Sequence, residues 1–183
     1  DNLKTAFLKA VDSDNKMVFK KPNVRSHYLA LFNSEVTIRE ATLDDAKLFF
    51  EWANDPVVRQ MAFHTEPIQW ENHIKWFKTK VESSNSHLLL CYHRTEPIGQ
   101  VRFDILDGGE AEIDISIAKE SRGKGYGKAM LEAAIEYEYC MNGVKSFVSE
   151  VKDVNSSSNR MFIACGFINI GKENGVIYYS LKK

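Results

Sequence analysis

Three glycines within five positions, Gly123, Gly125 and Gly127, separate a segment of alternating apolar residues from a long helical pattern. The segment before them, 112–117, places isoleucine at every second position and predicts a strand, whereas 124–139 predicts a helix. Glycine permits backbone conformations closed to other residues and lets a bulky group approach the chain. Because the first amides of a helix lack internal partners and lie at the positive end of its dipole, this turn predicts a phosphate-binding site.

The residues around the glycines exclude two familiar nucleotide motifs. A Walker loop requires Ser or Thr after its lysine, and here Ala129 follows Lys128. A dinucleotide fingerprint requires G-x-G-x-x-G, whereas the spacing here is G-x-G-x-G. The pattern Arg/Gln-x-x-Gly-x-Gly/Ala fits without a gap at Arg122, Gly125 and Gly127, and it resembles the coenzyme A pyrophosphate loop of the GNAT acetyltransferases. Taken alone, these residues are also compatible with a plain glycine-rich turn.

A second stretch, 146–167, resembles the same family. A predicted strand ends at Glu150-Val151, Asn155 is placed to cap the next helix, and Gly166 is placed to end it. The order and the spacing, one helix and one strand after the glycine loop, match those of GNAT proteins. The chain is therefore identified as a member of this superfamily. The resemblance implies an α/β (α+β) fold with a central mixed, mostly antiparallel sheet flanked by helices.

The remaining periodicities predict the element order β-α-α-β-β-β-α-β-α-β-β over 36–181, which is the GNAT order. Thr42 and Asp45 form a capping-box pattern at the start of the first helix, which Pro56 interrupts after about residue 53. Residues 36–183 are assigned to the acetyltransferase domain. Residues 1–35 show two short helical patterns instead, and we interpret them as a candidate tail of an upstream domain.

The composition argues against several classes of protein. The net charge is −1 and no basic tract is visible, which argues against a nucleic-acid partner. No run approaches the roughly 18 apolar residues of a membrane span, and no signal peptide is recognisable. The three cysteines, Cys91, Cys140 and Cys165, are odd in number and lack motif spacing, which favours a cytoplasmic protein without a disulfide framework or a metal site.

The resemblance implies acetyl-CoA as the cofactor and direct transfer to an amine in a ternary complex. Such a reaction needs a base for the amine, a donor for the thioester carbonyl and a proton source for the thiolate. In GNAT proteins the pantetheine arm pairs with the strand before the loop, and Asn155 is either a ligand of that arm or only a helix cap. The expected cofactor-binding residues are therefore Ile115, Ile117, Arg122, Gly123, Lys124, Gly125, Tyr126, Gly127 and Asn155.

Three carboxylates compete as the general base. Glu150 ends a strand that, by resemblance, separates from its neighbour at the acetyl site, and it is the first choice. Glu112 and Asp114 lie on one face of the loop strand by alternation. The alternative for each is an ordinary strand carboxylate that faces solvent or pairs with lysine. The family's usual acid, a Tyr seven residues after the loop Asn, is Phe162 here, which leaves water or the hydroxyls of 156–158 to protonate the thiolate.

The acceptor site of GNAT proteins lies near the first two helices. The run Trp-x-Asn-Asp-Pro-x-Val-Arg at 52–59 resembles two subgroups, the ribosomal-protein alanine N-acetyltransferases and the N-acetyltransferases of nucleotide-linked amino sugars. Residues 63–68 and 97–104 are closer to the second subgroup, whose members can be fused behind a nucleotide-sugar hydrolase. The expected acceptor is a UDP-linked amino sugar of polysaccharide or nonulosonic acid biosynthesis. The candidate substrate-binding residues are Arg59, Phe63, His64, Trp70 and Arg102, each with a purely structural alternative.

Two other functions stay open at this point. The domain is alternatively a ribosomal-protein-type or small-amine acetyltransferase, or a CoA-binding sensor that has lost catalysis, which Phe162 favours. The sequence leaves the oligomeric state open, a homodimer included.

Overall fold

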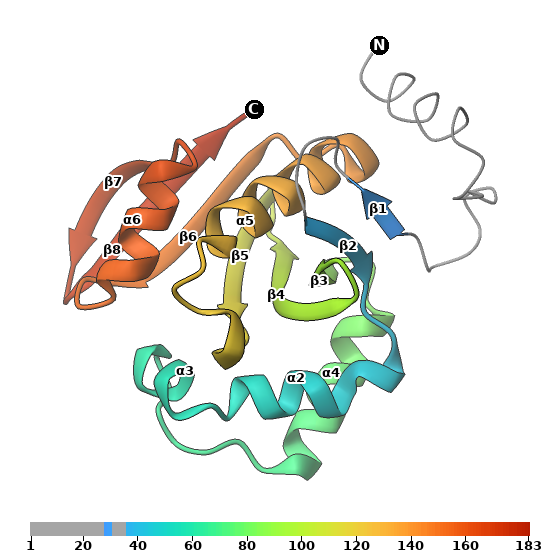
Figure 1. Ribbon diagram of the computed structural model, residues 1–183. Coiled ribbons are helices and arrows are strands. Elements are labelled where there is room, and N and C mark those ends of the chain that lie inside the picture. The colour runs from blue at the N-terminus through green and yellow to red at the C-terminus, as the bar shows by residue number, and fades with distance from the viewer. Residues whose placement is uncertain (1–27, 31–35) are drawn as a thin grey trace.

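The computed structural model describes residues 28–30 and 36–183, which form one sheet with helices on both faces (Figure 1). The strands are β1 (Tyr28–Ala30), β2 (Val36–Glu40), β3 (Ser86–His93), β4 (Glu96–Ile105), β5 (Glu110–Ile117), β6 (Ser146–Lys152), β7 (Ile168–Glu173) and β8 (Val176–Lys182). The helices are α2 (Ala46–Ala53), α3 (Pro56–Met61), α4 (Trp70–Glu82), α5 (Tyr126–Tyr137) and α6 (Ser156–Ala164), with the short 3-10 turns η1 (Leu43–Asp45) and η2 (Lys119–Ser121) and the π-turn η3 (Glu138–Asn142).

The sheet has eight strands in the order β1-β2-β3-β4-β5-β6-β8-β7. Among these described strands, β5 and β6 are the one parallel pair, and the other neighbours are antiparallel. The predicted fold, a mixed and mostly antiparallel sheet flanked by helices, is confirmed.

One correction concerns the segment before the domain. Residues 28–30, which the sequence pattern assigned to a helix, form a strand whose Tyr28 lies opposite Arg39 and whose Ala30 lies opposite Thr37. The open edge of β2 offers backbone partners, and these outweigh the weak local helical pattern. Residues 1–27 and 31–35 lie outside the described part of the chain, so their helical assignment stays a prediction.

The parallel pair of β5 and β6 covers only three residues of each strand. Its register runs from Glu110 opposite Ser146 to Glu112 opposite Val148, although both strands continue beyond these positions. The two strands therefore separate halfway along the sheet. Just past this point, the Ser149 hydroxyl donates a hydrogen bond of 3.1 Å to the Ile113 carbonyl. This hydrogen bond replaces the backbone pairing with β6 that ends at Glu112.

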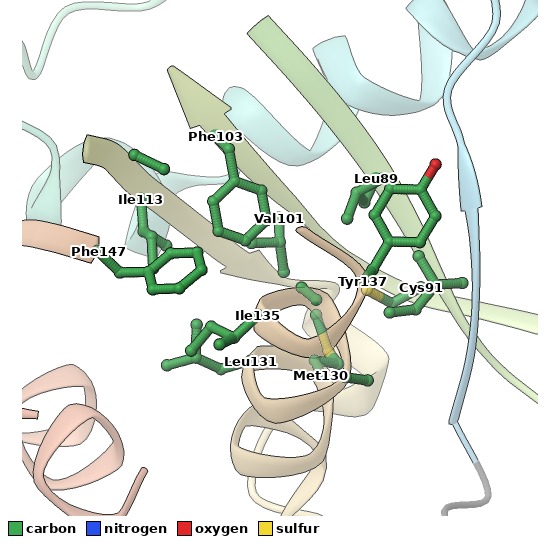
Figure 2. Close-up of a cluster of buried hydrophobic side chains, with 14 of the residues drawn as sticks. Leu89, Cys91, Val101, Phe103, Ile113, Met130, Leu131, Ile135, Tyr137 and Phe147 are labelled. Carbon is green, nitrogen blue, oxygen red and sulfur yellow. The ribbon is translucent and has the colours of Figure 1, made fainter. Parts of the chain in front are cut away.

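The larger hydrophobic core lies between α5 and the sheet. Figure 2 shows Met130, Leu131 and Ile135 of α5 beside side chains from β4, β5 and β6. Phe103 and Phe147 pack edge to face with their ring centroids 5.9 Å apart. Because the glycine loop leads directly into α5, this packing also fixes the position of the loop relative to the strands.

A smaller core lies on the opposite face, between the sheet and α2 and α4. Phe49 and Phe77 meet at 5.0 Å, and β3 contributes Leu88 and Leu90. The predicted capping box at the start of this region is confirmed, since the Thr42 amide donates to Asp45 at 2.7 Å.

The structure adds α3 to the predicted order. Pro56 does not merely interrupt a helix; it occupies the first turn of a new one, where a missing backbone N–H costs nothing. The Asp55 side chain caps this helix by accepting from the amides of Val57 and Val58 at 3.0 and 3.2 Å.

Candidate active site

A cavity of about 1020 Å³ opens where β5 and β6 separate. Its walls come from the outer halves of these two strands, the glycine loop, the first turn of α6, and the face of α3 and α4 that looks toward the sheet. The separation of the strands leaves backbone of β5 without a neighbour on this side. The cavity therefore joins the predicted phosphate site to the predicted acceptor region.

The glycine loop has the open geometry that an anion requires. Gly123 and Gly125 adopt φ values of +73° and +83°, and nothing lies within 4 Å of the position a Cβ would occupy. Gly125 is also the N-cap of α5, so the first amides of that helix point into the cradle. Gly127 has another role, because a Cβ there would lie 2.9 Å from both Ile117 and Met161 side-chain atoms. The residues present thus fit a pyrophosphate group.

The side chains of the loop differ in whether they line the cavity. Arg122 lines the cavity, but its guanidinium donates to the Ile117 carbonyl at 3.1 Å and pairs with Asp55 at 2.8 Å. Lys124 is exposed and does not line the cavity wall. Tyr126 lines it and packs on the His93 ring at a centroid distance of 4.9 Å.

The structure brings two of the three candidate bases into the cavity. Glu150 and Asp114 both line it and are exposed, and both lie on the sheet face that carries α2 and α4. Asp114 accepts a hydrogen bond of 3.1 Å from Gln100 and lies 3.8 Å from the Arg102 guanidinium. Glu112 shares the strand face but lies where β5 is still paired with β6, outside the cavity wall.

Phe162, at the place of the usual acid, contributes only packing. Its side chain is buried, stacks on Tyr179 at 5.5 Å and meets Phe167 edge to face at 5.0 Å. The Tyr179 hydroxyl donates to Asn159, so it is engaged elsewhere. Asn155 caps α6 by accepting from the Ser158 amide at 3.2 Å. The side chains that line the cavity around the start of α6 are Asn155, Ser156, Ser157 and Ser158.

Three of the five predicted acceptor residues line the cavity. These are Arg59, Phe63 and Arg102. His64 and Trp70 lie outside its wall: His64 accepts from Arg59 through its backbone carbonyl at 3.0 Å, and Trp70 packs edge to face on Phe50 at 5.2 Å.

The Arg102 guanidinium is held from several sides. It lies 5.5 Å from the centre of the Trp76 ring and 3.0 Å from the Asp104 carboxylate. Asp104 in turn accepts from Lys80 at 2.6 Å and from Ser86 at 2.7 Å. This network fixes a cation and an aromatic face at the acceptor end of the cavity.

The family model described as the acetyltransferase (GNAT) domain matches residues 35–168. The chain belongs to this GNAT family. It is a GNAT-type N-acetyltransferase domain, and the predicted family membership and enzyme class are confirmed.

Two curated proteins have sequences similar to this chain. An uncharacterized protein of Methanocaldococcus jannaschii is 26% identical over 151 residues, which are 80% of this chain and 31% of that protein. The chain therefore spans about a third of that relative. An uncharacterized N-acetyltransferase of Bacillus licheniformis is 22% identical over 144 residues, covering 75% of this chain and 81% of that protein.

Solved GNAT structures share the fold at low sequence identity. The spermidine N-acetyltransferase of Vibrio cholerae, in complex with CoA and spermine, has a TM-score of 0.73 at 20% identity and covers 82% of this chain and 96% of its own. An aminoglycoside acetyltransferase in complex with coenzyme A has a TM-score of 0.70 at 19% identity, covering 81% and 95%. These similarities establish the arrangement of strands and helices.

His73 also lines the cavity, although it was not predicted as a site residue. It is buried, and its Nε2 lies 2.8 Å from the Ala46 carbonyl, so that nitrogen carries the proton. Burial lowers the pKa of His73, although the hydrogen bond to the carbonyl opposes the shift. The imidazole is therefore neutral near pH 7. Its spacing of four from the buried Phe77 is the signal that could have placed it on the inner face of α4.

Lys152, Gln100 and Ser149 also line the cavity without having been predicted as site residues. Ser149 and Lys152 lie on β6, where its point of separation from β5 decides which residues reach the cavity, and Gln100 lies on β4 opposite Ser116 of β5. Among the described residues, no cluster of three His, Cys, Asp or Glu side chains could hold a metal ion. No helix in the same part of the chain is both long and apolar enough to cross a membrane.

Proposed function

We propose that this domain transfers the acetyl group of acetyl-CoA to the amine of a nucleotide-linked amino sugar, in a ternary complex and in the cytoplasm. The observation that supports it is a single cavity, which joins an open glycine cradle to a pocket with two carboxylates and three cations. The resemblance of residues 52–59, 63–68 and 97–104 to amino-sugar N-acetyltransferases supports the acceptor class.

The cofactor side of the cavity has backbone groups for the pyrophosphate and the pantetheine arm of an acyl-CoA. The amides of 123–127 would hold the pyrophosphate. The part of β5 at Ile115 and Ile117, which β6 no longer pairs, would take the pantetheine arm, with Asn155 beside it. When bound, acetyl-CoA supplies an acetyl group already activated as a thioester. The protein contributes position and proton transfer.

Glu150 is the preferred base. Asp114 shares its carboxylate with Gln100 and lies near Arg102, whereas Glu150 stands on the opposite side of the strand gap. From there, Glu150 takes the proton of the bound ammonium directly or through one water. The Ser149 hydroxyl already donates to a carbonyl, so the hydroxyls of 156–158 and water are the proposed proton source for the departing thiolate.

The charges at the acceptor end favour an anionic acceptor over a polyamine. Arg59, Arg102 and Lys152 line this part of the cavity, against Asp114 and Glu150. A diphosphate would be attracted to such a site, and a polycation would meet three like charges. The Trp76 and Phe63 rings offer faces for a sugar or a base. The runner-up is a small-amine or N-terminal peptide acceptor.

A thiol-release assay with acetyl-CoA tests the acceptor class. It compares a UDP-linked 4-amino sugar, spermidine and a peptide that begins with alanine, each at matched concentration. We expect rapid turnover with the sugar nucleotide alone. Turnover with only spermidine or the peptide would overturn the assignment of the acceptor as a sugar nucleotide. CoA binding without turnover on any amine would overturn the proposed enzymatic activity and support a CoA-binding sensor.

Glu150→Gln tests the base. We expect kcat to fall by about 100-fold near neutral pH, with the deficit shrinking as pH rises and the free amine becomes abundant. Glu112→Gln is the matched variant, since its carboxylate lies on the same sheet face but outside the cavity, and it should keep most of its turnover. A wild-type pH profile for Glu150→Gln would remove Glu150 as the base.

A further inference from the structure

Helix α3 forms a wall of the cavity without being anchored by a hydrophobic core. None of its six residues is buried, although Val57, Val58, Arg59 and Met61 all line the cavity. An element with so little buried surface gains little stability from packing, and its position depends on the polar contacts at its ends.

Polar contacts hold both ends of α3 to the two sides of the strand gap. At its C-terminal end, Lys152 of β6 donates to the Ala62 carbonyl at 2.6 Å and to the Gln60 carbonyl at 3.3 Å. At its N-terminal end, Asp55 pairs with Arg122, the first residue of the glycine loop, at 2.8 Å. The Asp55 side chain is 11% exposed, and the Arg122 side chain is 27% exposed.

One oxygen of Asp55 makes three contacts at once. It accepts from the two α3 amides at 3.0 and 3.2 Å and from the Arg122 guanidinium, while Arg122 also donates to the Ile117 carbonyl. Burial opposes ionisation of this carboxyl, but Arg122 and the two amides hold the pKa of Asp55 below its ordinary value. The carboxylate is therefore charged throughout the neutral range.

We propose that the Asp55–Arg122 ion pair couples the glycine loop to α3, so that cofactor binding orders the acceptor wall. Asp55 is a positioning residue in this scheme: it does not line the cavity and acts only through Arg122. A loop held in its binding conformation fixes Arg122, Arg122 fixes the cap of α3, and α3 presents its side chains to the acceptor. By linkage, an ordered α3 strengthens cofactor binding by the same factor.

Direct electrostatics predicts the opposite effect of removing Asp55. Coenzyme A is an anion, and deleting a carboxylate near its loop would raise affinity if the carboxylate acted only through its charge. A weaker affinity after neutralisation therefore identifies a positional role. This inference rests on the proposed function in one respect, namely that 122–127 bind CoA.

The test uses Asp55→Asn, Arg122→Gln and the double variant, with CoA itself as the probe. Asparagine is a good N-cap, so Asp55→Asn keeps the contacts to the α3 amides and removes the charge. We expect calorimetry to show CoA bound about 5-fold more weakly or worse by Asp55→Asn. In the Arg122→Gln background, Asp55→Asn should cause no further loss. Hydrogen exchange of the amides at 57–62 should slow on CoA binding in the wild type and not in Asp55→Asn.

Glu51→Gln on α2 is the matched control, because it removes an exposed carboxylate that lies 3.9 Å from Lys47 and does not line the cavity. Unchanged or tighter CoA binding by Asp55→Asn, or an equal loss in the wild-type and Arg122→Gln backgrounds, would overturn the coupling alone. Failure of the wild type to bind CoA would overturn the proposed function and the coupling with it.

Discussion

The three glycines of the loop are required for different physical reasons. Gly123 and Gly125 need left-handed backbone and face open space, whereas Gly127 is a place of close packing between α5, β5 and α6. Open space at the first two positions means that a side chain there would not disturb the fold by collision. Such a side chain would instead hinder the binding of a ligand that approaches the loop from the cavity.

Gly125→Val separates binding from folding. We expect CoA affinity to fall at least about 10-fold, because the side chain enters the cradle, while the left-handed conformation costs only about 1–2 kcal/mol of stability. Calorimetric titration with CoA and thermal unfolding measure the two effects. Gly143→Val is the matched variant, since Gly143 has φ +75° and the same open surroundings away from the cavity. Equal CoA affinity in both variants would contradict the assignment of the loop.

At the scale of elements, an ion pair ties β2 to the first helices. Asp45 receives two hydrogen bonds from the Arg39 guanidinium, at 2.6 and 2.7 Å, and both side chains are largely buried. Burial opposes ionisation of Asp45, but Arg39 and the Thr42 amide hold its pKa below the ordinary value. Removing the carboxylate would leave the Arg39 charge partly buried without this partner.

We expect Asp45→Asn to lower the free energy of unfolding by about 3 kcal/mol at pH 7. Because the folded-state pKa of Asp45 is depressed, its contribution is fully present well above the unfolded-state value, about 3.9. It is lost as pH falls through the folded-state pKa. Urea unfolding at pH 7 and at successively lower pH measures the difference between the two proteins. A difference that stayed constant down to pH 2 would contradict the role of ionisation.

The order of elements could be predicted from the sequence because each has its own periodicity and end signals. The strand and the helix on either side of the glycine loop follow from residues within those elements, and so does the Asn155 cap. The start of α3 was missed because Pro56 ends one helix and begins another within three residues. Strand β1 was missed because its partner, not its own pattern, makes it a strand.

The candidate site was predicted most completely where it is contiguous in the chain. The glycine loop lies in six successive residues, so its geometry follows from local rules. The contact of Arg122 with Asp55, the exclusion of Glu112 from the cavity and the inclusion of Lys152 all depend on where β5 and β6 separate. That point is set by pairing between distant segments, which local patterns do not encode.

At the scale of the whole molecule, the two hydrophobic cores share strands. Along β3, Leu89 and Cys91 belong to the core under α5, whereas Leu88 and Leu90 belong to the core under α2 and α4. A strand that contributes alternate residues to both cores cannot keep one intact while the other opens. The two cores should therefore unfold together.

Phe147→Ala and Phe77→Ala test this cooperativity, one in each core. Both side chains are fully buried, and each truncation should lower stability by about 3–5 kcal/mol. We expect each variant to unfold in a single calorimetric transition at a lower Tm. Two separate transitions in either variant would show that the cores melt independently.

The short junction between β5 and β6 also bears on how the active site is acquired during folding. Strands β3, β4 and β5 pair in sequence order, and so do β7 and β8, whereas β2 reaches β3 across α2 to α4 and β6 reaches β8 across α6 and β7. The junction joins these two halves by only three residue pairs, so it gains little until both halves have formed and is expected late. The cavity exists only after that closure. During refolding, CoA binding should consequently recover after the far-ultraviolet circular dichroism signal, which makes ligand binding a reporter of the last step in folding.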